Sequence, residues 1–72
     1  MSQPLMEPVA SSSIEAIGYD PATSELHVRF ISGRTYVYLE VPEAVYDSLL
    51  TAGSIGRHLN HFVRPPFEYR AE

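Results

Sequence analysis

The stretch that most constrains the fold runs from residue 30 to residue 42 and has the sequence FISGRTYVYLEVP. Gly33 marks a turn, and the run after it is apolar on both faces before it stops at Pro42. Proline has no backbone donor and a fixed φ, so it ends a strand and suits the first turn of a helix. The stretch therefore predicts a β-hairpin followed by a helix, and with them an α+β fold class.

We expect two further strands before this stretch. Residues 25–30 alternate apolar and polar side chains, and residues 13–19 form a shorter strand ahead of them. The turn between these strands, residues 20–24, contains Asp and Pro, which favour reversal of the chain. The sequence thus predicts a small antiparallel three-stranded β-meander, with the C-terminal tail as a candidate fourth strand, packed against two C-terminal helices.

Two registers are open for the hairpin at Gly33. A two-residue turn places Val28 opposite Val37 and points the strand's two tyrosines to the surface. A three-residue loop places Val28 opposite Tyr36 and points the tyrosines into the core. We favour the loop, because a type I′ turn requires positive φ at Ser32 as well as at Gly33, whereas the loop requires it only of the glycine.

Two helices are expected after the sheet. The first begins at Pro42 and stops near Gly53, and its apolar stripe consists of Val45, Leu49 and Ala52. Ser54 can cap a second helix that extends to about Val63. One side of this second helix is apolar, and the opposite side carries polar and basic residues, namely Arg57, Asn60, His61 and Arg64.

Length, composition and charge limit the function classes. With 72 residues the chain forms one domain over residues 13–72, after a flexible lead-in over residues 1–12 that is rich in proline and serine. No cysteine, basic leader or long apolar run is present, so we expect a cytoplasmic protein without a membrane partner. A net charge of −4 argues against binding to nucleic acid mainly through phosphate contacts, although residues 53–67 contain no acid.

The order and spacing of short motifs from Ile14 to Tyr69 resemble the KTSC domain. This family is named after a C-terminal extension of some lysyl-tRNA synthetases and also occurs as short bacterial and phage proteins. The resemblance rests on Ile17-Gly18-Tyr19-Asp20, the alternation of Leu26, Val28 and Phe30, Gly33, Tyr36-Val37-Tyr38, Val41-Pro42, Val45-Tyr46, Ala52, Ser54, Gly56 and Asn60. It implies a few strands followed by helices, no established function, and RNA binding as the role suggested by the synthetase fusion.

Two sets of residues are candidates for RNA binding. Tyr36 and Tyr38 can stack on bases if they face outward, whereas strand tyrosines more commonly fill a core. The basic side of the second helix can hold a phosphate through arginine forks, or it is a solvated face whose arginines pair with acids. This second set consists of Arg57, Asn60, His61 and Arg64.

The second face of the sheet is a candidate partner interface. If the tyrosines face the helices, the residues left on the other face are Ile31, Val37 and Leu39, with Ile17 and Tyr19 as further candidates. A small domain rarely leaves such a patch in water, so a second copy or another protein can cover it. The alternative is cover by the chain itself, through residues 1–10 or 67–69.

Catalytic chemistry is not indicated. The chain has no cysteine nucleophile, no serine in an elbow motif and no enforced carboxylate pair, so we expect neither an enzyme nor a cofactor. His58 and His61 have a spacing that suits one metal ion, but no further ligand lies nearby, so no metal site is expected. The sequence predicts a non-catalytic binding module for RNA or tRNA, with a protein-interaction or dimerisation module as the alternative.

Overall fold

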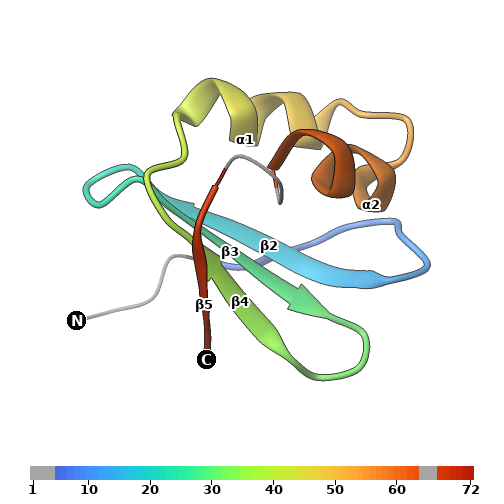
Figure 1. Cartoon of the computed structure of the whole chain (residues 1–72). Coiled ribbons are helices and arrows are strands. Elements are labelled where there is room, and N and C mark those ends of the chain that lie inside the picture. The colour runs from blue at the N-terminus through green and yellow to red at the C-terminus, as the bar shows by residue number, and fades with distance from the viewer. Residues whose placement is uncertain (1–4, 64–66) are drawn as a thin grey trace.

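The structure, a computed structural model, places two helices on one face of a single antiparallel sheet (Figure 1). It describes residues 5–63 and 67–72, with only the backbone described at residues 61 and 62. Within these ranges the sheet has five strands, which follow one another in chain order: β1 (Glu7–Pro8), β2 (Ile14–Asp20), β3 (Glu25–Phe30), β4 (Thr35–Tyr38) and β5 (Tyr69–Ala71). The predicted α+β fold is confirmed, and the C-terminal tail does form a strand.

Strand β1 was not expected from the sequence, which predicts a flexible lead-in over these residues. Its two residues pair with β2, Glu7 opposite Ile17 and Pro8 opposite Ala16. Pro8 lacks a backbone donor, so it is tolerated here because β1 is an edge strand. The chain before β2 is therefore part of the sheet, although its contribution is short.

The β3–β4 hairpin has the three-residue loop that the turn chemistry favours. Val28 lies opposite Tyr36, and Gly33 has a φ of 99°. The loop is closed by two backbone hydrogen bonds, from Gly33 N to the Phe30 carbonyl at 2.9 Å and from Phe30 N to the Arg34 carbonyl at 2.8 Å. Tyr36 therefore shares the helix-facing side of the sheet with Val28.

The helical layer begins where Pro42 predicts it. Helix α1 (Glu43–Leu50) ends three residues before Gly53, and α2 (Ile55–His58) continues into a π-helical turn, η1 (Leu59–Val63). The hydroxyl of Ser54 caps α2 by accepting a hydrogen bond from Arg57 N at 3.4 Å, as predicted. None of the helices in the described residues has the length and apolar character that a membrane crossing needs.

The core lies between the helices and the facing side of the sheet. Its fully buried residues come from β2, β3, β4, α1, η1 and the segment before α1: Ile14, Ile17, Leu26, Val28, Tyr38, Val41, Leu49, Leu59 and Val63. The expectation that Ile17 and Tyr19 face away from the helices is wrong. Tyr19 stacks on Tyr46 of α1 with ring centroids 5.2 Å apart, because β2 pairs it with Leu26, and directly opposed residues share a face.

The second face of the sheet is covered by both ends of the described chain. Val37 is 0% exposed there. On one side of it lie His27 and, one strand further, Gly18, where an added Cβ would stand 2.8 Å from the sulfur of Met6. On the other side Arg70, directly opposite Val37, extends to the carboxylate of Glu25 at 3.1 Å. The face therefore presents no exposed apolar patch at Val37.

Candidate nucleic-acid interface

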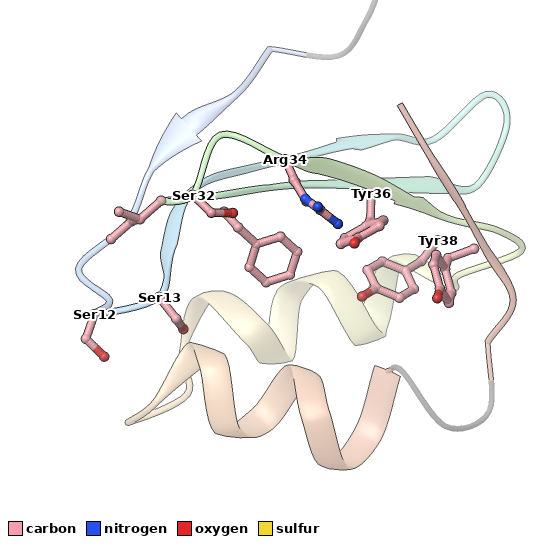
Figure 2. Close-up of a pocket in the computed structure, with 9 residues that line it drawn as sticks. Ser12, Ser13, Ser32, Arg34, Tyr36 and Tyr38 are labelled. Carbon is pink, nitrogen blue, oxygen red and sulfur yellow. The ribbon is translucent and has the colours of Figure 1, made fainter.

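A cleft of about 510 Å³ lies beside the β3–β4 hairpin (Figure 2). We call it the aromatic cleft. Its walls come from the loop before β2, from the hairpin and from β5, and the lining residues are Ser12, Ser13, Phe30, Ile31, Ser32, Arg34, Tyr36, Tyr38 and Tyr69. Segments more than 50 residues apart in the chain therefore meet in one cleft.

Four aromatic rings in contact form the body of this cleft. Tyr36 lies edge-on against Phe30 and against Tyr69, with ring centroids 5.5 and 5.2 Å apart. Tyr38 contacts the same Tyr69 ring at 5.6 Å. Tyr38 is 1% exposed, whereas Tyr36 is half-buried and Tyr69 is 54% exposed. Tyr38 is thus the floor of the cleft, and Tyr36 and Tyr69 present aromatic surface to a ligand.

Arg34 supplies the positive charge of the aromatic cleft. It is exposed, and Figure 2 shows its guanidinium on the same side of the sheet as Tyr36 and Tyr38. The ion pairs among the described residues involve Arg70 and His27, and none includes Arg34. No aspartate or glutamate is among the described residues that line the cleft. An anionic group beside the rings would therefore meet a cation that no acid of the described ranges neutralises.

A second, polar cleft of about 400 Å³ lies next to the first. We call it the serine groove, and its lining residues are Ala10, Ser11, Ser12, Ser13, Gly53, Ser54, Ile55, Gly56, Arg57 and Asn60. Arg57 and Asn60 are exposed there. The two clefts have Ser12 and Ser13 in common.

The predicted RNA-binding residues are thus divided between the two clefts. Tyr36 and Tyr38 line the aromatic cleft, and Arg57 and Asn60 line the serine groove. Arg64 and the side chain of His61 lie outside the described residues. The sequence interpretation missed Arg34, Tyr69 and the serines, although the arginine directly after Gly33 was a usable signal.

The predicted partner interface is not one surface in the structure. Ile31 is 57% exposed in the hairpin loop and belongs to the aromatic cleft. Val37 is buried on the opposite face of the sheet. Leu39 is half-buried in a third cleft, which it shares with Phe67. The three residues therefore do not present a common patch.

The side chain of His58 contacts helix α1. Its Nε2 lies 3.0 Å from the hydroxyl of Ser48, and this contact joins α2 to α1. The same hydroxyl donates to the Val45 carbonyl at 2.8 Å. Across the described residues, no three His, Asp or Glu side chains come together as a metal site would require.

The chain is similar to known proteins both in sequence and in fold. Residues 10–67 match the KTSC domain family. This chain belongs to the KTSC family. A KTSC domain protein from Yersinia pestis has a crystal structure that superposes with a TM-score of 0.90 at 37% identity, covering 97% of this chain and 99% of that one.

KTSC relatives occur in proteins of very different length. A protein from Tsukamurella paurometabola is 56% identical over 62 residues, which cover 86% of this chain and 92% of that protein. A lysine–tRNA ligase from Nostoc punctiforme is 36% identical over 66 residues, which cover 92% of this chain but 12% of the ligase. The KTSC domain is therefore found both as most of a short protein and as a small part of a tRNA ligase.

Proposed function

We propose that this KTSC domain is a non-catalytic module that binds single-stranded RNA at the aromatic cleft. The observation that carries the proposal is the presence of two accessible tyrosine rings beside an arginine outside every described ion pair. A base stacked on an aromatic ring contributes about 1–3 kcal/mol. A guanidinium can hold the neighbouring phosphate with two parallel hydrogen bonds.

The overall charge sets the expected balance of forces. A molecule of net charge −4 repels a polyanion at long range, so stacking has to supply much of the affinity. Each phosphate that is neutralised should contribute a slope of about −0.7 when log affinity is plotted against log salt. We therefore expect modest affinity with a shallow but measurable salt dependence.

The relatives support RNA as the ligand class. The ligase from Nostoc punctiforme is named for tRNA, and a segment 36% identical to this chain forms part of it. A domain that shares its chain with a tRNA ligase is a candidate to contact the RNA on which that enzyme acts. The aromatic cleft is a site through which the domain can contact that RNA.

The experiment compares two arginines of one hairpin by fluorescence anisotropy with a labelled single-stranded RNA pool. Arg34→Gln should weaken binding about tenfold, because a charge-assisted contact to phosphate is lost. Arg29→Gln is the matched control, since Arg29 carries the same charge on β3 but lies opposite Thr35 on the second face. It should bind as the native protein does.

Two results would contradict the proposal. One is an absence of salt-sensitive binding to any mixed RNA pool. The other is an equal loss of affinity in the Arg34 and Arg29 variants, since that would indicate general electrostatics in place of a cleft. Tyr69→Ala gives an independent reading, because it removes the most exposed ring of the cleft without changing the charge.

The alternative of a protein-interaction or dimerisation module has less support. It depended on Val37 being available on the second face, and Val37 is fully buried within one chain. Ile31 is the exposed apolar residue that remains of the predicted patch, and it lies at the aromatic cleft. A protein partner would then compete with RNA for that cleft.

A further inference from the structure

We infer that a bound RNA strand continues from the aromatic cleft across Ser12 and Ser13 into the serine groove, where Arg57 holds a second phosphate. This inference rests on the proposed function and extends it from one nucleotide to a strand of several. It assigns a role to the serine-rich segment and to Arg57, which contributes nothing to the core of the fold.

The geometry of the two clefts carries the inference. Ser12 and Ser13 line both, so they form the boundary that a ligand in one cleft must cross to reach the other. Both residues are exposed, and their hydroxyl groups can hydrogen-bond to phosphate oxygens or to a ribose 2′-hydroxyl. We call Ser11, Ser12 and Ser13 the serine ridge.

The serine ridge is held in place from both sides. Its Ser13 carbonyl accepts a hydrogen bond from Ile31 N, on the wall of the aromatic cleft, at 3.0 Å. The Ser13 hydroxyl oxygen lies 2.9 Å from where a Cβ on Gly56 would stand, so the lack of a side chain at Gly56 admits the ridge against α2. Ser11 Oγ accepts from the backbone N of Ser13 and Ile14, each at 3.2 Å. Arg34 and Arg57 are thus carried on walls joined by a fixed ridge.

Charge distribution points to the same path. The molecule has nine acidic residues against five arginines, yet no acid is among the described residues lining either cleft. Each cleft instead has one exposed arginine that takes part in no ion pair among the described residues. Two cationic positions separated by a hydroxyl-bearing ridge suit two phosphates of one strand, since single-stranded binders combine stacking rings with a positive groove that follows the backbone.

The test measures how the effect of each arginine depends on ligand length. The probes are adenosine 5′-monophosphate and oligoadenylates of two, four and eight nucleotides, titrated by calorimetry and by NMR into the full chain. Arg57→Gln should leave the affinity for the monophosphate unchanged and should lower the affinity for the octamer about tenfold. The slope of log affinity against log salt for the octamer should become shallower by about 0.7 to 1. Arg34→Gln should lower the affinity for every one of these ligands.

A second variant tests the ridge itself. Ser12→Asp places a carboxylate on the path between the two clefts, and it should weaken the octamer at least as much as Arg57→Gln does. Among the described residues none shares a hydrogen bond with the Ser12 side chain, so the fold should be retained, which circular dichroism can check. Arg29→Gln, which alters charge on the far face, should bind the octamer as the native protein does.

The failures of the two proposals are distinguishable. If Arg57→Gln and Ser12→Asp leave octamer binding unchanged while Arg34→Gln weakens it, the strand does not cross the ridge, and the aromatic cleft alone binds RNA. If no oligomer and no monophosphate binds the native protein, the proposed function fails and this inference fails with it.

Discussion

Gly18 shows at the residue scale how tightly the N-terminal segment is packed on the second face. A Cβ at this position would stand 2.8 Å from the Leu5 carbonyl oxygen and 2.8 Å from the Met6 sulfur. The sulfur is on a flexible side chain and can move, but the carbonyl belongs to the backbone and cannot move alone. The absence of a side chain at Gly18 therefore lets the chain before β1 lie against the sheet.

Replacement of Gly18 by alanine should cost about 1–3 kcal/mol in the free energy of unfolding, because overpacking forces the backbone to shift. Urea denaturation of the two proteins measures this difference. Gly53→Ala is the matched control, since nothing lies within 4 Å of a Cβ there and its stability should change little. Equal effects of the two substitutions would contradict the packing that the structure shows.

At the scale of elements, β5 is attached to the sheet by more than its ladder with β4. Arg70 of β5 extends past β4 to Glu25 of β3, with 3.1 Å between Nη1 and the carboxylate oxygen, and its Nε lies 3.2 Å from Glu72. The hydrogen bond and charge of Arg70 hold the pKa of Glu25 below its ordinary value near 4.5. The ion pair thus links the third, fourth and fifth strands.

This link predicts a pH dependence of stability with a definite sign. Because the pKa of Glu25 is lower in the folded than in the unfolded chain, its contribution is present above the unfolded value and is lost as pH falls through the folded value. Arg70→Gln should raise the pKa of Glu25 toward its ordinary value, as carboxyl NMR titration can measure, and should reduce the acid-induced loss of stability. Arg29→Gln should leave the pKa of Glu25 unchanged. A shift of that pKa in the Arg29 variant would count against Arg70 as the cause of the lowered value.

For the whole molecule, the covered second face determines the expected assembly state. Val37 is buried by neighbours within one chain, so the sheet needs no second copy to shield it. We expect a mass of 8.1 kDa by light scattering, and Ile31→Glu should leave that mass unchanged. A native dimer that Ile31→Glu dissociates would instead favour the interaction module.

Much of the fold could be predicted because its signals are local. Glycine alone tolerates the φ of 99° at Gly33, and this requirement determines the hairpin register and with it the direction of Tyr36. Pro42 and Ser54 likewise mark helix starts through their own backbone and side-chain chemistry. Strand β1 gave no such signal, since two residues are too few to show a period.

The candidate site could be predicted only in part, because local signals do not show which distant residues meet. The sequence by itself determined the fold class, the turn and the aromatic and basic residues that are available for binding. Only the tertiary structure decided that Tyr69 joins Tyr36, that the serine ridge separates Arg34 from Arg57, and that Arg70 and Met6 close the second face. Those contacts join residues that are far apart in the sequence. Neighbouring residues determine the conformation of a turn, but they do not determine which distant side chains come into contact.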